Sequence, residues 1–340
     1  MAAPLVLYGD FRDLPNLCSE KLGARAIETN DDFFAPKENL TKDSTPIFIP
    51  DKYVDTGKWM DGWESRRRRE PGHDWCIVHL GFPGVLSGFN VDTAHFLGNY
   101  PEHCSIEGCL AEEKFNSSTA KWVEILPKSK LEGGKENLFP VKNPNVFSHL
   151  RLNIFPDGGV ARLRVHGRAK PDWSKFLKES KPLNLAALEL AAEVVTCNDM
   201  FFGNKDNLIQ PGQSQSMADG WETKRKRVPG YDWTIIKLGH PGVLSRLEID
   251  THHYKGNFPE SCSVEACTQT SATAEDFKSQ KDMRWVEVLP RTKLKAHSAF
   301  VFEKELSSAV RSTVFTHLRL NIYPDGGIAR LRAIGIAKPV

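Results

Sequence analysis

The sequence predicts an all-β protein built from two tandem β-sandwich or jelly-roll domains, each with a short helical segment near its start. Three observations carry this prediction: an internal duplication along the chain, many short runs of alternating apolar and polar residues, and Gly/Pro/Asn-rich connections between those runs. The length of 340 residues is that of about two domains. No apolar run approaches the roughly 18 residues of a membrane-spanning helix, so we expect no membrane partner.

The duplication is clearest in two stretches of seventeen residues. Residues 148–164 read S-H-L-R-L-N-I-F-P-D-G-G-V-A-R-L-R, and residues 316–332 repeat this with three conservative changes. Further matches follow the same order, and changes in their offset mark loops of different length. The period is that of a domain duplication, since solenoid repeats are only about 20–50 residues long. We therefore expect domains at 1–172 and 173–340.

The segment before the first strands has helical character. Leu185 to Ala192 are strong helix formers, although the matching part of the first copy is weaker. Residues 74–80 are apolar on both sides, as in a strand buried between layers. Shorter runs at 105–109 and 122–127 have the length and spacing of further sandwich strands.

The duplicated stretch itself reads as two strands joined by a tight turn. Apolar residues alternate with His149, Arg151 and Asn153 in the first strand, and with Arg162 and Arg164 in the second. The P-D-G-G sequence between them has the residue types of a reversal. We expect a hairpin whose outer face gathers these polar side chains and binds an anion.

A second duplicated stretch, residues 61–75 and 219–233, contains D-G-W-E followed by a basic run. Two positions of this run change from arginine to lysine between the copies, and two do not. The unchanged positions are Arg67, Arg69, Arg225 and Arg227. A site that grips a planar carboxylate or urea group favours the guanidinium fork over lysine. The alternative is a solvated basic edge strand.

Acids, histidines and asparagines recur beside this run. Glu64 and Glu222 lie in D-G-W-E, and each is either a general base or a partner for a neighbouring arginine. The third stretch reads D-T-A-H-F-L-G-N in the first copy and D-T-H-H-Y-K-G-N in the second. It supplies Asp92, His95, Asn99, Asp250, His253 and Asn257. Histidine is the side chain best suited to move protons near neutral pH, but these histidines could also only orient a neighbour.

Other site classes lack their signatures. No H-E-x-x-H or comparable spacing occurs, so we expect no metal and no cofactor. The sequence also lacks a serine-hydrolase elbow, a P-loop and a dinucleotide fingerprint. Seven cysteines without a C-x-x-C indicate reduced, buried thiols.

The net charge and the terminal sequences restrict the partners and the cellular location that we expect. The formal net charge of +2 and the short basic runs argue against nucleic acid. The N-terminus lacks a secretory signal, and we expect a cytoplasmic protein. The C-terminus has no S-K-L, which leaves peroxisomal association open. Duplicated sandwiches often assemble further, so a homo-oligomer stays an open alternative.

Taken together in order, the motifs D-G-W-E-[ST]-x-R-x-R, D-T-x-H-x-x-G-N, H-L-R-L-N and P-D-G-G-x-A-R, each present twice, resemble the allantoicase family. The resemblance covers nearly the whole chain. It implies galactose-binding-domain-like jelly rolls and hydrolysis of allantoate to (S)-ureidoglycolate and urea in purine (allantoin, ureide) degradation. The substrate would be a small molecule that carries one carboxylate and two ureido groups.

The residue types that recur at matching positions of the two copies give a candidate site, and they fit the chemistry that the resemblance implies. The expected catalytic residues are Glu64, Asp92, His95, His149, Glu222, Asp250, His253 and His317. The expected substrate-binding residues are Arg67, Arg69, Asn99, Arg151, Asn153, Asp157, Arg162, Arg225, Arg227, Asn257, Arg319, Asn321, Asp325 and Arg330.

Within that set, roles are a hypothesis. Arg151 and Arg162 would take the carboxylate with help from Arg67 or Arg69. Glu64 or Asp92 would polarise water, and His95 or His149 would shuttle the proton. The alternative function is a catalytically inactive allantoicase-like jelly roll that binds a small anion or carbohydrate. The sequence does not say which copy works.

Overall fold

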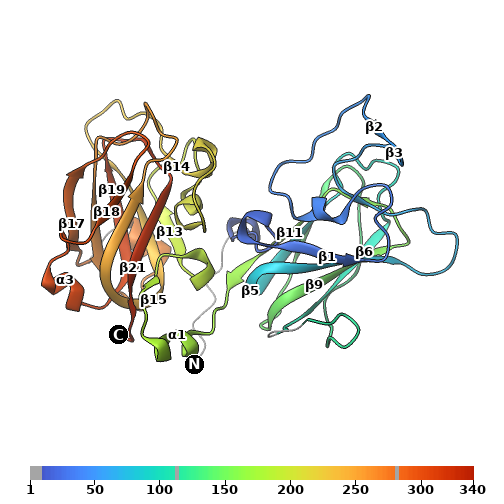
Figure 1. The fold of residues 1–340 in the computed structure, drawn as a ribbon, viewed down its shortest axis with the longest axis horizontal. Helices are drawn as coiled ribbons and strands as arrows, with labels where there is room; N and C mark the ends of the chain where they lie inside the picture. The colour runs from blue at the N-terminus through green and yellow to red at the C-terminus, as the bar shows by residue number, and fades with distance from the viewer. Residues whose placement is uncertain (1–9, 112–114, 280–282) are drawn as a thin grey trace. The chain divides into compact units, whose positions relative to one another are not determined.

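The structure is a computed structural model that describes residues 10–111, 115–279 and 283–340. The chain divides into two compact units, residues 1–170 and 171–340 (Figure 1). Each unit is dominated by β-strands arranged as a jelly-roll sandwich, and the expected all-β class is confirmed. No helix of the described residues is long and apolar enough to cross a membrane.

The first unit is organised around one long strand, β5. Its strands are β1 (Arg25–Thr29), β2 (Tyr53–Val54), β3 (Gly57–Lys58), β4 (Trp63–Glu64), β5 (Asp74–Asp92), β6 (His103–Cys109), β7 (Val123–Lys130), β8 (Glu136–Pro140), β9 (Val146–Phe155), β10 (Gly159–Val160) and β11 (Arg162–Ala169). Short 3-10 helices are η1 (Phe11–Asp13), η2 (Glu20–Leu22) and η3 (Lys37–Thr41).

The two ends of β5 belong to different layers. Its first part pairs with β1 and β9, and β9 continues through β6 to β7. The register then shifts between His79 and Gly84, and the second part of β5 pairs with β11 and β8. One strand thereby serves both sheets of the sandwich.

The core lies between these layers. Leu150, Leu152 and Ile154 of β9 are fully buried in one cluster with Leu163 and Val165 of β11. Period-two alternation thus places both apolar faces against a single core, as the sequence predicts. Burying each such side chain contributes roughly 1.5–3 kcal/mol relative to exposure.

The expected hairpin is wrong, because the two strands of the duplicated stretch lie in different sheets. In the described pairing, β9 is bonded to β5 and β6, whereas β11 is bonded to the distal part of β5. The connection does reverse the chain, but across the core. His149 and Arg151 therefore lie on the outside of one sheet, and Arg162 lies on the outside of the other.

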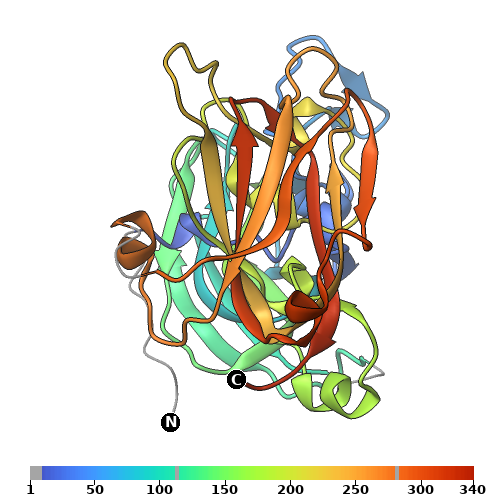
Figure 2. The same cartoon turned by 90° about the vertical axis from the view of Figure 1, so that its left-hand side faces the viewer.

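The second unit repeats this topology. Its strands are β12 (Leu183–Asn184), β13 (Glu193–Cys197), β14 (Trp221–Glu222), β15 (Asp232–Asp250), β16 (Ser261–Cys267), β17 (Val286–Lys293), β18 (Ala299–Phe302), β19 (Phe315–Tyr323), β20 (Gly327–Ile328) and β21 (Arg330–Ala337). Long β15 pairs with β13 and β19 at one end and with β21 and β18 at the other. Figure 2 faces this unit and shows its long strands running side by side.

Helical structure is sparse. The α-helices are α1 (Trp173–Glu179), α2 (Ala274–Ser279) and α3 (Ser308–Ser312), and the further 3-10 helices are η4 (Leu188–Leu190), η5 (Lys205–Ile209) and η6 (Met217–Asp219). The predicted helical segment from Leu185 is reduced to η4. The amide of Leu185 donates to Ala333 and its carbonyl accepts from Gly239, so neighbouring strands take the groups that a helix would use. Tertiary pairing overrides propensity here.

The seven cysteines are free thiols, and all but the half-buried Cys197 are buried. Burial raises the pKa of Cys18 and of Cys104 to about 12. Such thiols stay protonated and act as small apolar side chains.

Candidate active site

The D-G-W-E and P-D-G-G motifs meet as a two-stranded ribbon. Glu64 lies opposite Gly159, and Trp63 lies opposite Val160. Trp63 is fully buried, and its indole N–H donates to the carbonyl of Asp31 at 2.8 Å. The buried tryptophan anchors this strand, so the position of the Glu64 carboxylate is set by the core.

The third motif is locked beneath the same ribbon. The Phe96 ring lies so close to Gly62 and Gly159 that a Cβ at these positions would meet ring atoms at 2.7 and 2.0 Å. Both positions therefore require glycine, because real Cβ contacts of this length do not occur. The hydroxyl of Thr93 donates to the carbonyl of Glu132 at 2.6 Å and fixes the start of the loop.

The Asp92 carboxylate stabilises this loop and does not line the cavity described below. It is buried at the end of β5, and its carboxylate accepts the backbone N–H of Ala94 at 2.8 Å. Burial raises the pKa of Asp92 above its usual value, and the hydrogen bond from Ala94 opposes that shift. The geometry is that of a group that shapes the loop carrying His95.

Glu64 and Asn99 form the polar centre of the site. The side-chain amide of Asn99 donates to Oε1 of Glu64 at 2.7 Å, and its backbone carbonyl accepts from Gly159. Burial raises the pKa of Glu64, and the hydrogen bond from Asn99 opposes that shift. A desolvated carboxylate is a stronger base than one in water.

His95 is held in one tautomer beside this pair. Its Nε2 lies 3.1 Å from the carbonyl of Pro46, and a carbonyl accepts but does not donate. Nε2 must therefore carry a proton, which leaves Nδ1 as the nitrogen for proton exchange. The backbone of His95 has φ 70°, as does that of His253 in the second copy. Non-glycine residues in this region are uncommon and concentrate at functional sites.

A cavity of about 420 Å³ joins these groups. Its lining consists of Phe34, Phe48, Lys58, Met60, Glu64, His95, Leu97, Gly98 and Asn99. Three of the lining residues, Phe48, Lys58 and Met60, belong to residues 46–60. These lie in the connection of residues 41–60, which is ten residues longer than its counterpart, residues 209–218, in the second copy. Strands β2 and β3 of this connection form the loop that projects from the first unit (Figure 1).

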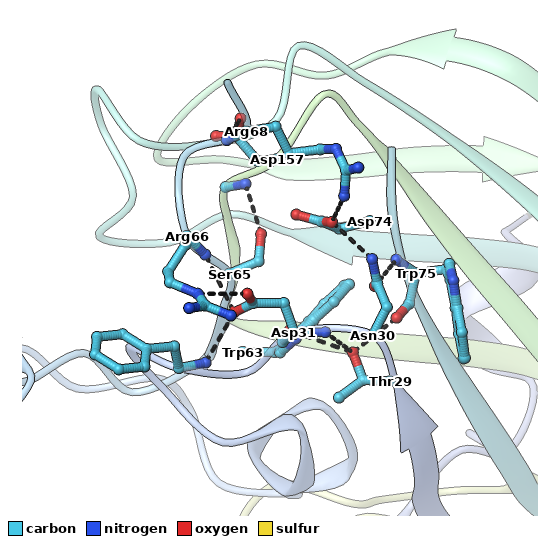
Figure 3. Close-up of polar contacts among 12 residues, drawn as sticks. Thr29, Asn30, Asp31, Trp63, Ser65, Arg66, Arg68, Asp74, Trp75 and Asp157 are labelled. Carbon is cyan, nitrogen blue, oxygen red and sulfur yellow. Dashed lines mark hydrogen bonds and ion pairs between the residues drawn. The ribbon is translucent and has the colours of Figure 1, made fainter. Parts of the chain in front are cut away.

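The basic run separates into structural and unpaired arginines. Arg66 is ion-paired with Asp31 at 2.7 Å, and Arg68 with Asp74 at 2.6 Å (Figure 3). Asp157 accepts the backbone N–H of Arg68 at 2.8 Å and so holds the run in place.

The lysines of the second copy keep these ion pairs, from Lys224 to Asp199 and from Lys226 to Asp232. Arg67 and Arg69, by contrast, are exposed and make no ion pair within the described part of the chain. They line a surface cavity of about 620 Å³ beside the run. The positions that tolerate lysine are the structural ones, whereas the guanidinium groups of Arg67 and Arg69 are available to a ligand.

Arg162 is placed as a structural residue. Its side chain is 0% exposed, and its guanidinium donates to the carbonyls of Ser44, Asp61 and Ala161 and to the carboxylate of Asp61. Burial raises the pKa of Asp61, but hydrogen bonds from Arg162 and from the amide of Ile47 outweigh it and hold the pKa below its usual value. Arg330 makes the same pair with Asp219 in the second copy. Neither guanidinium has an open face for a substrate.

His149, Arg151 and Asn153 lie on the outer face of the sheet that contains β9. Nε of Arg151 donates to Glu107 at 2.8 Å, and the amide of Asn153 donates to the same carboxylate. The arginine lies against the ring of Trp122 at 4.9 Å. The second copy repeats this arrangement with Arg319, Asn321, Glu265 and Trp285. The structure therefore separates Arg151 from Arg162, which were expected to bind one carboxylate together.

His149 is buried in an aromatic cluster on that outer face. It stacks on Phe115 at 4.0 Å, and its Nδ1 lies 2.9 Å from the Ser148 hydroxyl. Burial lowers the pKa of His149 to about 4, and nearby His79 adds to the shift. Burial likewise lowers the pKa of His317 to about 3. A histidine that stays neutral at pH 7 and lines no part of the Glu64 cavity is poorly placed as its proton shuttle.

The second copy keeps the ribbon but not the long connection. Asn257 donates to Glu222 at 2.5 Å, and Nε2 of His253 lies 2.8 Å from the carbonyl of Ser214. The Met217 sulfur lies 3.8 Å from the side-chain amide nitrogen of Asn257.

The two aspartates of the second copy hold loops in place. Asp250 accepts hydrogen bonds from the backbone and the ring of His252, and Asp325 accepts the backbone N–H of Lys226. Arg225 and Arg227 line a cavity of about 510 Å³ with Phe202.

Sequence reasoning missed the apolar and cationic lining of the first cavity. Phe34, Phe48, Lys58, Met60 and Leu97 are not among the recurring acids, histidines, asparagines and arginines from which the site was predicted. The signal that could have found three of them is the unequal length of the connection before D-G-W-E. A search of the described residues finds no group of three or more His, Cys, Asp or Glu that could hold a metal ion.

Comparison with known proteins gives a consistent result. The family model described as "Allantoicase repeat" matches residues 15–170 and 183–338. A Burkholderia mallei protein described as a probable allantoicase is 45% identical and covers 94% of each chain. The allantoicase of Dictyostelium discoideum is 46% identical over 93% of this chain and 85% of that one. A crystal structure of allantoicase from Saccharomyces cerevisiae matches with a TM-score of 0.77 at 33% identity, covering 94% of this chain and 92% of that one.

Proposed function

This chain belongs to the allantoicase family, and we propose that it hydrolyses allantoate to (S)-ureidoglycolate and urea. The observation that carries the proposal is that Glu64, His95 and Asn99 face one cavity in a chain made of two allantoicase repeats. Three motifs far apart in sequence supply these groups or hold them in place.

The reaction replaces one ureido group on the central carbon of allantoate with a hydroxyl. The Glu64 carboxylate takes a proton from water, and the resulting hydroxide bonds to the central carbon. The carbon–nitrogen bond breaks, and its electron pair goes to the departing urea nitrogen. That nitrogen receives a proton from His95, and the proton on Glu64 then returns to His95 through solvent.

The structure supports this division of roles by geometry. Burial raises the pKa of Glu64, which strengthens it as a base. Pro46 holds the Nε2–H of His95, so protonated His95 gives up the proton on Nδ1. Asn99 orients Glu64 through its amide nitrogen. A general acid or a general base in such a position typically increases the reaction rate by roughly 10²- to 10⁴-fold.

The arginine assignments change with the geometry. We assign attraction and orientation of the substrate anion to Arg67 and Arg69, whose guanidinium groups are exposed and unpaired among the described residues. Arg151 and Arg162, by contrast, are committed to Glu107 and Asp61. Their role in the proposal is to hold the strands that frame the site.

One assay tests the proposed function. Purified protein is incubated with allantoate, and urea is measured over time with and without a chelator. We expect urea release at the same rate in both reactions, because the proposed chemistry uses side chains alone. Absence of urea above the blank would contradict the proposal, and loss of urea with the chelator would contradict its metal-independent mechanism.

A further inference from the structure

We propose that Lys58 binds the carboxylate of the substrate in the Glu64 cavity and thereby makes the first copy the working site. This inference rests on the proposed function and adds to it a ligand that neither the repeated motifs nor the family match assigns. Lys58 lies on β3, within residues 46–60, for which the second copy has no equivalent strands.

The lysine is held with part of its hydrogen-bonding capacity unused. Its ammonium donates to the carbonyl of Pro50 and lies 4.9 Å from the ring centres of both Phe48 and Tyr53. An ammonium has three donors, so two remain after the bond to Pro50. Within residues 10–111, 115–279 and 283–340, Lys58 has no ion-pair partner. The aromatic contacts orient the cation without neutralising it.

The cavity around Lys58 complements a small carboxylate that also carries ureido groups. Glu64 and Asn99 offer a hydrogen-bond acceptor and an amide to the ureido N–H and C=O groups. Lys58 is the cationic member of a lining that is otherwise neutral or anionic at neutral pH, apart from a protonated His95. Buried Met60 and half-buried Phe34 give the cavity apolar walls that strengthen a charge–charge contact beside them, whereas Leu97 is exposed.

The second copy lacks this cation. Its shorter connection, residues 209–218, reads I-Q-P-G-Q-S-Q-S-M-A and contains neither lysine nor arginine. The Met217 sulfur instead lies against Asn257, the counterpart of Asn99. The second copy therefore keeps the acid, histidine and amide but has no cation on its connection, and its lysine at this site, Lys255, stands instead at the position of Leu97.

The test compares Lys58→Met with a matched control on the same hairpin. Methionine keeps an apolar stem against Phe48 and Tyr53 and removes only the charge. The control is Lys52→Met, because Lys52 also lies over an aromatic ring, that of Trp59 at 3.8 Å, but does not line the cavity. Both variants and the native chain are assayed with allantoate and with the analogue whose carboxylate is replaced by a carboxamide.

We expect Lys58→Met to raise KM for allantoate about 10- to 100-fold, the range for a lost charge-assisted hydrogen bond, with kcat within about threefold. Lys58→Arg should recover part of the loss. The penalty should disappear with the carboxamide, which offers no anion to bind. Lys52→Met should behave as the native chain does.

The other outcomes either overturn the role of Lys58 or separate it from a failure of the proposed function. If the native chain releases urea but Lys58→Met and Lys52→Met share its KM, the inference fails and the proposed function stands. If Lys58→Met impairs both substrates equally, the lysine is structural and the inference fails. If the native chain releases no urea, calorimetric binding of intact allantoate decides. Weaker binding to Lys58→Met than to Lys52→Met supports the carboxylate contact, and equal or absent binding overturns it.

Discussion

The two copies present the same acid, histidine and amide on differently built loops. In the first copy, residues 46–60 add β2, β3 and three lining residues to the Glu64 cavity. In the second copy, the connection is ten residues shorter, and Met217 lies against the amide that orients Glu222. The comparison shows that the proposed catalytic groups are part of the duplicated scaffold, whereas three lining residues of the Glu64 cavity are carried by a connection that differs in length between the copies.

The largest predicted difference between the copies concerns the histidines. His95→Gln should lower kcat for allantoate by roughly 10²- to 10⁴-fold, because glutamine cannot carry the proton to the departing urea. His253→Gln should change kcat by less than about threefold. Steady-state urea release from the two variants checks this. Equal losses would show that both copies turn over substrate.

The next difference concerns the buried ion pairs. Arg162→Met should lower the free energy of unfolding by about 3–5 kcal/mol, because it leaves the buried Asp61 carboxylate with only the partly exposed Lys42 ammonium, 3.7 Å away, as its ion-pair partner. Arg330→Met should cost about 1 kcal/mol less, since Nε of Arg330 makes no hydrogen bond within the described residues whereas that of Arg162 does. Urea denaturation followed by tryptophan fluorescence measures both. A larger loss for Arg330→Met would contradict this order.

The basic run gives a comparison within the first copy. Arg67→Lys or Arg69→Lys should raise KM about tenfold, because lysine lacks the planar fork that orients the incoming substrate anion. Arg66→Lys and Arg68→Lys should leave KM within about twofold, because the second copy already holds lysines in the same ion pairs. The four variants form a matched set with the same change of residue type. Equal changes in KM at all four positions would contradict the division into ligand-binding arginines (Arg67, Arg69) and structural arginines (Arg66, Arg68).

The last predicted effect is on the pH dependence of stability. The pKa of His149 is lowered to about 4 and that of His317 to about 3 by burial, against about 6.5 in the unfolded chain. As pH falls below about 6.5, the unfolded chain binds protons that the folded chain does not, so the free energy of unfolding falls. The fall continues to a lower pH for His317 than for His149.

Melting temperatures at pH 7.5 and pH 5 check this prediction. Relative to the native chain, His149→Gln and His317→Gln should lose less stability on acidification, because the titrating group is gone. The control is His73→Gln, which changes an exposed histidine. A change in acid sensitivity as large for the control as for the buried positions would contradict the assignment.

Much of the fold follows from local sequence, and its departures have identifiable causes. Alternation in residues 148–164 correctly places Leu150 and Leu163 in the core. It cannot say that β9 and β11 pair with opposite ends of β5, because strand partners are set by long-range register. The helix-forming residues from Leu185 are held by strand hydrogen bonds instead of a helix.

Part of the candidate site could also be predicted from the sequence. The grouping of Glu64, His95 and Asn99 was expected because all three recur in both copies. The sequence does not predict which arginines are exposed or which acids they pair with. Arg162 was therefore predicted to bind substrate, although it is buried and paired with Asp61 of the D-G-W-E motif. Lys58 has no counterpart in the second copy, and comparison of the copies could not assign it a role.

The central claim is that the first copy hydrolyses allantoate, and the most direct measurement is urea release by the native chain, Glu64→Gln and Glu222→Gln under identical conditions. The two substitutions are isosteric and remove the same carboxylate from equivalent positions. We predict urea from the native chain and from Glu222→Gln at similar rates, and a rate at least about 10²-fold lower from Glu64→Gln. No urea from the native chain, or a loss confined to Glu222→Gln, would contradict the claim.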